Sequence, residues 1–147
     1  MPKTVGSILQ QKGSDVWSVS PDATVYEAIE MMAGRGVGAL VVLDGTLLVG
    51  IISERDYTRK VILQGRSSKD TAVREIMSTP VQSVAPDRTV DEAMRIMSAS
   101  QVRHLPVVDE GKVVGVISLG DLVRRILSVQ GEMIRHLQEY ITGKKHP

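Results

Sequence analysis

The chain has 147 residues, 42% of them hydrophobic, which corresponds to one ordinary domain with enough apolar residues for a packed core. Its formal net charge of +1 and its lack of cysteine give no reason to expect nucleic-acid or anionic membrane binding, and they exclude disulfides and thiolate metal sites. No apolar run has the length of a membrane span and no signal segment opens the chain, so we expect a cytoplasmic protein.

The chain contains an internal repeat. Residues 16–57 align without a gap with residues 81–122, at an offset of 65 and with about 19 of 42 residues identical. Such a duplication indicates two copies of one supersecondary unit that pack into a single body with pseudo-twofold symmetry. Shorter matching segments precede the copies: Val5, Ile8 and Leu9 match Val73, Ile76 and Met77. We therefore expect each repeat to include its own lead-in segment.

Each repeat predicts the same order of elements, namely strand, helix, strand, strand and helix. In the first repeat Thr24 is a candidate N-cap before apolar residues spaced as on one face of a helix, and Thr89 takes this place in the second. Two aliphatic runs, 39–43 and 47–52, flank an Asp-Gly turn and are typical of paired strands. A helix is expected to follow from about residue 55.

The duplication divides the chain into three parts. We expect repeat 1 over residues 5–68, repeat 2 over residues 73–128, and a C-terminal amphipathic helix and tail over residues 129–147. The apolar residues of the last part recur at helical spacing: Met133, Ile134, Leu137, Tyr140 and Ile141. The repeat does not account for this helix, which is expected either to bury against a second copy or a partner, or to fold back on its own core.

Three segments of repeat 2, residues 84–93, 105–109 and 115–121, carry a recognisable signature. They read as a Val-x-Pro-x-x-Thr-Val-x-x-Ala start, a Leu-Pro-Val-Val-Asp strand and a Gly-Val-Ile-Ser-x-x-Asp end. In this pattern the chain resembles the cystathionine beta-synthase (CBS) domain family. Repeat 1 keeps the end of the signature at residues 50–56, but Val41 replaces the strand proline. The resemblance implies an α/β fold of two CBS repeats packed as a pseudo-twofold pair, similar to stand-alone CBS-pair proteins.

The Gly-x-x-Ser-x-x-Asp ends of the repeats predict binding residues. A glycine lets the backbone approach a ligand, Ser53 would lie at a helix start whose amides favour phosphate, and the Asp56 carboxylate can accept from both ribose hydroxyls. The CBS resemblance implies this role for Ser53 and Asp56, with Arg55 beside them, and for Ser118 and Asp121. The alternative is a capping box, in which each Ser and Asp only satisfies the backbone of its own helix.

The residues before the second strand of each repeat are further candidates. The resemblance implies that Val37, Gly38 and Ala39, and their counterparts Val102, Arg103 and His104, border the ligand. Arg103 and His104 would contact phosphate, although a solvated basic pair is an equal alternative. A metal ligand role for His104 is not expected, because no other His or Cys clusters near it. Few aromatic residues are present, so the walls around an adenine would be aliphatic, with Ala28, Ile52, Ala93 and Ile117 as candidates, although a plain core position is the favoured interpretation of each.

These features favour a regulatory module over an enzyme, because no catalytic group is evident. The resemblance implies an adenosine-containing ligand, AMP, ADP or ATP, with NAD as a further candidate, and a homodimer that acts on an unidentified partner protein. Plant relatives of this type are linked to thioredoxin regulation. The alternatives are an enzyme that uses the bound nucleotide, or a structural adaptor with vestigial sites.

Overall fold

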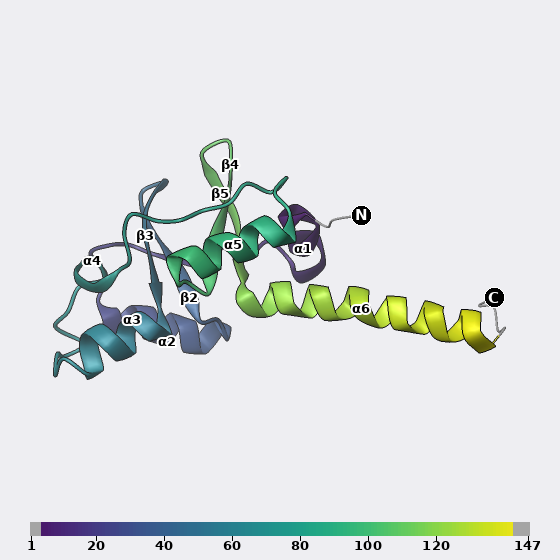
Figure 1. The fold of residues 1–147 in the computed structure, drawn as a ribbon. Helices are drawn as coiled ribbons and strands as arrows, with labels where there is room; N and C mark the ends of the chain where they lie inside the picture. The colour runs from purple at the N-terminus through teal and green to yellow at the C-terminus, as the bar shows by residue number, and fades with distance from the viewer. Residues whose placement is uncertain (1–3, 143–147) are drawn as a thin grey trace.

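A computed structural model describes residues 4–142 and confirms an α/β fold built from two repeats and a C-terminal helix (Figure 1). The elements of the first part of the chain are α1 (Val5–Lys12), β1 (Ser18–Val19), α2 (Val25–Arg35), β2 (Ala39–Asp44), β3 (Leu47–Ser53), α3 (Glu54–Tyr57) and the π-helical η1 (Thr58–Ile62). Those of the second part are α4 (Val73–Ile76), α5 (Val90–Ser100), β4 (His104–Asp109), β5 (Lys112–Ser118) and α6 (Leu119–Thr142).

The predicted N-caps begin the two equivalent helices. The Thr24 hydroxyl accepts from the amide of Glu27, and the Thr89 hydroxyl accepts from the amide of Glu92, whose carboxylate accepts from the Thr89 amide in return. Each cap satisfies amides that the first helical turn leaves without an intrahelical partner. Helix α2 ends at Gly36, which has a positive φ of 66°, a conformation that glycine adopts without strain.

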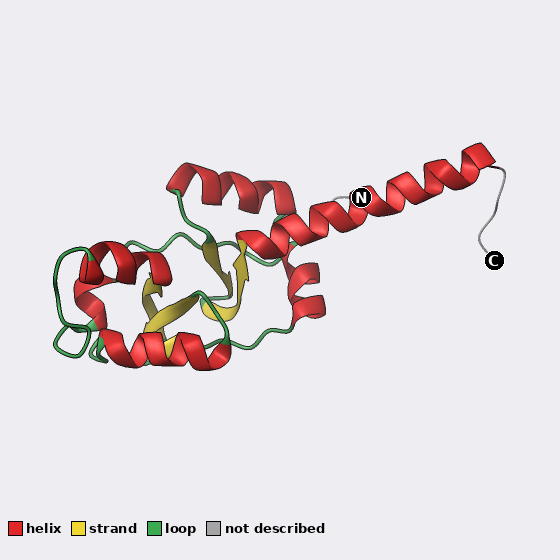
Figure 2. Cartoon of the chain, turned by 90° about the horizontal axis from the view of Figure 1, so that it is seen from below, coloured by secondary structure: helices red, strands yellow, loops and turns green. Residues whose placement is uncertain are grey.

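The strands form two small sheets that lie among the helices (Figure 2). One has the order β1-β2-β3, with β1 parallel to β2 and β2 antiparallel to β3, and the other pairs β4 with β5 antiparallel. Ala39 pairs with Ser53 in the first sheet and His104 pairs with Ser118 in the second. The register is therefore the same in both repeats. In each repeat it pairs the first residue of one strand, Ala39 or His104, with the serine that ends the following strand.

The lead-in helices are exchanged between the repeats, so that each packs against the other repeat. The Val5 amide of α1 donates to the Arg88 carbonyl at 2.8 Å, and the Val73 amide of α4 donates to the Ala23 carbonyl at the same distance. Helix α1 accordingly packs into the core of repeat 2, and α4 into that of repeat 1. The exchange joins two small cores into one body, in which neither repeat is complete without the other.

Two glycines make room for this exchange. A Cβ atom at Gly50 would lie 2.5 Å from the Met77 Sδ atom, and one at Gly115 would lie 2.7 Å from Leu9 Cδ2. Met77 and Leu9 belong to the exchanged lead-in segments. These glycines, which we expected to admit a ligand, therefore admit a side chain of the other repeat's lead-in segment.

Helix α6 is longer than predicted. It runs without a break from Leu119 to Thr142, through residue 128 where we placed the end of repeat 2, and its second half projects away from the rest of the molecule (Figure 1). The alternative that it folds back on its own core is thus wrong for the described residues. Within residues 4–142 no helix is both long and apolar enough to cross a membrane. Residues 143–147 of the expected tail lie outside the described part.

Candidate functional site

Two cavities contain the predicted serine and aspartate residues. The larger, of about 560 Å³, contains Asp56 and is called the Asp56 pocket. Its walls are Gly38, Ile51, Ser53, Glu54, Arg55, Asp56, Arg59, Lys60, Ser78, Ser100, Gln101, Val102, Arg103 and His104. The other, of about 460 Å³, is called the Asp121 pocket. Its walls are Lys12, Gly13, Asp15, Trp17, Gly36, Val37, Gly38, Ala39, His104, Val116, Ser118, Asp121 and Arg124.

Each pocket combines residues of both repeats. The Asp56 pocket takes its carboxylate from repeat 1 and residues 102–104 from repeat 2, whereas the Asp121 pocket takes its carboxylate from repeat 2 and residues 37–39 from repeat 1. Every predicted binding residue thus lines at least one of the two cavities. Gly38 and His104 line both, so the cavities are neighbours that share a wall.

Asp56 is buried, with 8% of its surface exposed, and its carboxylate has four neighbours. Oδ2 accepts from the Ser53 amide at 2.9 Å and from the Ser53 hydroxyl at 3.0 Å. Oδ1 accepts from the Ser78 hydroxyl at 3.2 Å and lies 3.1 Å from Lys60 Nζ. Ser78 follows the exchanged helix α4, so the lead-in segment of repeat 2 contributes directly to the site of repeat 1.

Asp121 has an equivalent arrangement with more positive charge. Oδ2 accepts from the Ser118 amide at 2.8 Å and lies 2.7 Å from Lys12 Nζ, while Oδ1 lies 2.5 Å from an Arg124 nitrogen. Burial alone would raise the pKa of Asp121, but hydrogen bonds from Lys12 and from the Ser118 amide outweigh burial and hold that pKa below its ordinary value. The carboxylate is therefore charged at neutral pH.

The capping interactions of both segments are present. The amides of Ser53 and Asp56 donate within the cap, and the Glu54 amide donates to the Gly38 carbonyl at 3.0 Å. In repeat 2, Ser118 and Asp121 exchange the same two hydrogen bonds. These amides are engaged and do not point to a phosphate site. The guanidinium and ammonium groups of the Asp56 pocket are its charged donors for a phosphate.

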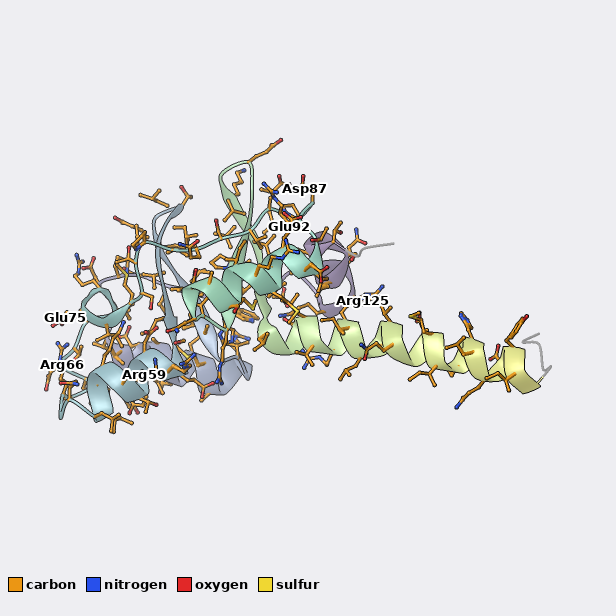
Figure 3. All side chains as sticks on the ribbon, viewed as in Figure 1. Arg59, Arg66, Glu75, Asp87, Glu92 and Arg125 are labelled. Atoms are coloured by element: carbon orange, nitrogen blue, oxygen red, sulfur yellow. The ribbon has the colours of Figure 1, made fainter. Side chains whose placement is uncertain are left out.

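Four aliphatic residues considered for the walls of an adenine site are core residues. Ala28, Ile52, Ala93 and Ile117 have no exposed surface, which agrees with the core interpretation and not with a ligand contact. Arg66 forms an ion pair with Glu75 on the side of repeat 1 that is remote from α6 (Figure 3). Arg59 and Lys60 of the same repeat do line the Asp56 pocket.

Among the pocket residues that sequence reasoning missed are Lys12, Trp17 and Ser78. All three lie outside the Gly-x-x-Ser-x-x-Asp segments, and Lys12 and Ser78 belong to the lead-in segments whose exchange the sequence does not reveal. Of these three residues, only Trp17 could have been singled out in the sequence, because it is the single tryptophan of the chain. Its ring stacks against the Arg35 guanidinium, 4.0 Å from the ring centroid.

His104 forms part of the wall between the pockets. A Cβ atom at Gly38 would lie 3.2 Å from His104 Nε2, so the imidazole packs against the glycine backbone of the other repeat. Burial, followed by the positive charge of Lys12, lowers the pKa of His104 below its ordinary value, and Asp121 opposes the shift only in part. The ring is therefore neutral at pH 7. No cluster of three or more potential metal ligands occurs in residues 4–142.

Comparison with known proteins identifies the family. The sequence model of the CBS domain matches residues 5–62 and 73–128, which together span most of the chain. The chain belongs to the CBS domain family. It is 39% identical, over 150 aligned residues, to the mitochondrial CBS domain-containing protein CBSX3 of Arabidopsis thaliana, covering 95% of this chain and 72% of the relative.

Solved structures of CBS proteins have the same fold. A protein with CBS domains from Burkholderia ambifaria MC40-6 is 47% identical with a TM-score of 0.82, over 86% of this chain and 95% of that one. The CBS domain pair of protein MJ0100, solved with 5′-methylthioadenosine and S-adenosyl-L-methionine, is 25% identical with a TM-score of 0.78, over 87% and 98%. A cyanobacterial CBS-CP12 protein, 27% identical with a TM-score of 0.76 over 84% and 67%, is hexameric.

Proposed function

We propose that this CBS pair is a regulatory module that binds adenine nucleotides, AMP, ADP, ATP or NAD, in its two pockets. The observation that carries the proposal is the duplicated pocket, in which a buried aspartate of one repeat lies beside the residues before the second strand of the other. A carboxylate with both oxygens in a cavity can accept from two vicinal hydroxyls of a ribose, and basic side chains nearby suit phosphate. MJ0100, with a similar fold, holds two adenosine compounds.

The proposed mode of action is a change of shape or assembly that a partner protein senses. Each pocket is lined by both repeats, so a ligand contacts both and is expected to alter how they pack. Binding to the folded state also stabilises it by mass action. Such a module needs no catalytic group.

A binding screen tests this proposal. Ligand at about 100 times its dissociation constant should add roughly 2.7 kcal/mol per site to the free energy of unfolding, which raises the melting temperature by several degrees at this size. AMP, ADP, ATP and NAD should do so, and GTP should do less. A melting temperature unchanged by all four at millimolar concentration would leave the adaptor alternative, and turnover of the bound nucleotide would indicate an enzyme.

We also propose that the chain forms a homodimer through α6. Large apolar side chains are exposed on this helix: Val123, Leu127, Val129, Met133, Ile134, Leu137, Tyr140 and Ile141. Each lies three or four residues from another of them, as on one face of a helix that buries in an interface. Two copies that pair along this face would cover it, and light scattering at micromolar concentration would detect the dimer.

A further inference from the structure

The two pockets differ in available positive charge. In the Asp56 pocket, four basic and two acidic side chains give a net formal charge of +2 with His104 neutral, whereas the Asp121 pocket has two of each. Within residues 4–142, the guanidinium groups of Arg55, Arg59 and Arg103 have no carboxylate at ion-pair distance. Only the Asp56 pocket therefore offers uncommitted arginines to an anion.

The cations of the Asp121 pocket are already engaged. Lys12 and Arg124 both contact the Asp121 carboxylate, at 2.7 and 2.5 Å. Asp15 adds a second negative charge to the walls. A polyphosphate placed here would meet two carboxylates and would have to break existing ion pairs to gain a cation, which makes this cavity a poor site for it.

The Asp121 pocket has an aromatic wall that the Asp56 pocket lacks. Trp17 is half-buried and lines the cavity, while its counterpart in the repeat is Gln82 and no Phe, Tyr or Trp lines the Asp56 pocket. The indole ring, already stacked with Arg35, offers a flat apolar surface on which a purine base can stack. The surroundings of Trp17 thus suit a base more than a phosphate chain.

On the basis of the proposed function, we propose that the pockets have different ligand classes. The Asp56 pocket takes an adenosine polyphosphate, whose phosphates contact Arg55, Arg59 and Arg103. The Asp121 pocket takes an adenosine compound with little or no negative charge, whose base stacks on Trp17. The chain then responds to two ligands at once, and the shared wall of Gly38 and His104 lies between them.

Titration of the full-length chain with ATP and with adenosine tests this division. Tryptophan fluorescence reports only on the Asp121 pocket, because Trp17 is the single tryptophan. Adenosine should change the fluorescence and ATP should not, although calorimetry should detect both. Saturation with ATP should leave adenosine binding possible, with one of each ligand per chain.

Matched variants test the residues. Arg103→Gln should weaken ATP binding by about 10- to 150-fold and leave adenosine unaffected, whereas Arg95→Gln, an exposed arginine of α5 outside both pockets, should change neither. Trp17→Gln should weaken adenosine by about 5- to 150-fold and leave ATP unaffected, and Trp17→Tyr should keep most of the adenosine affinity.

The outcomes separate the two proposals. If ATP and adenosine compete for one site, or if each variant weakens both ligands equally, the division between the pockets is wrong while nucleotide binding stands. If neither compound binds the wild-type chain at millimolar concentration, the proposed function itself fails and the division fails with it. Two independent sites with opposite responses to the Arg103 and Trp17 variants support the division.

Discussion

The Nζ atom of Lys12 lies 2.7 Å from Oδ2 of Asp121, although 109 residues separate them in the chain. The same ammonium donates to the Val116 carbonyl of β5 at 3.0 Å. Lys12 is the last residue of α1, so these contacts fix the end of the exchanged lead-in helix to the binding segment of repeat 2. The exchange of the lead-in helices therefore also places Lys12 in the wall of the Asp121 pocket.

Substitution of Lys12 tests this link. Lys12→Met keeps an apolar stem but removes the ammonium, which leaves the buried Asp121 carboxylate with fewer partners and should cost about 1 to 2 kcal/mol of unfolding free energy. Urea denaturation measures the loss. Lys112→Met, at an exposed lysine that begins β5, is the control and should have little effect. Equal stability of the two variants would show that the pair contributes nothing.

The glycines beneath the lead-in segments give a second prediction. A methyl group at Gly50 or Gly115 would collide with Met77 or Leu9, so Gly50→Ala and Gly115→Ala should each lower the unfolding free energy by roughly 1 to 3 kcal/mol. Gly34→Ala is the control, because its methyl group would meet open space within α2 and should stabilise by about 0.5 to 1 kcal/mol. Thermal denaturation of the three variants distinguishes a steric clash with the lead-in side chains from a loss of stability that any replacement of glycine would cause.

Local patterns predicted much of this fold. Thr24 and Thr89 begin helices because a hydroxyl before an apolar helical face caps the free amides, and the strand pairs follow from aliphatic runs on either side of a tight turn. Asp56 and Asp121, which the repeated segments mark as candidates, each line a pocket. Each of these features depends on residues close together in the sequence or on the repeat itself.

Contacts between distant segments could not be predicted in this way. The residues that match between Val5 and Val73 show that both lead-in segments exist, but apolar side chains fit the core of either repeat equally well, so their exchange leaves no signal in one sequence. The same holds for Lys12 and Trp17, which reach the Asp121 pocket only because α1 crosses to repeat 2 and β1 pairs with β2. The position of Arg103 in the wall of the Asp56 pocket likewise depends on how the two repeats pack against each other.

His104 should make stability depend on pH. Its pKa in the folded state lies below the unfolded value of about 6.5, so the unfolded chain binds more protons in this range and the folded state loses stability as pH falls. The wild type should lose up to about 1.4 kcal/mol per pH unit below pH 6.5 from this residue. His104→Gln should remove that part of the slope in urea denaturation at pH 5.5 to 7.5, and His136→Gln, at an exposed position on α6, should not. Parallel slopes for wild type and His104→Gln would contradict the prediction.

The apolar face of α6 gives a prediction about assembly. Leu137→Asp places a charge in the middle of the proposed dimer interface and should shift the chain to a monomer in light scattering at micromolar concentration. Ser128→Asp adds the same charge at an exposed position of α6 on the side opposite the apolar face, and should leave the dimer intact. A monomeric wild type, or a dimer that survives Leu137→Asp, would show that this face does not pair two copies.

The aspartates at the ends of the repeats separate capping from ligand binding. Asp56→Ala and Asp121→Ala each remove a helix cap, which should cost about 1 kcal/mol of unfolding free energy, and each also removes the proposed ribose anchor of one pocket. With ATP and adenosine both saturating, equilibrium dialysis should show the total bound ligand falling from two toward one per chain in either variant. Asp109→Ala, at an exposed aspartate that ends β4, should keep both ligands. Variants that melt lower but bind two ligands as the wild type does would mean that these aspartates serve only as helix caps, because a ribose anchor cannot be removed without loss of affinity.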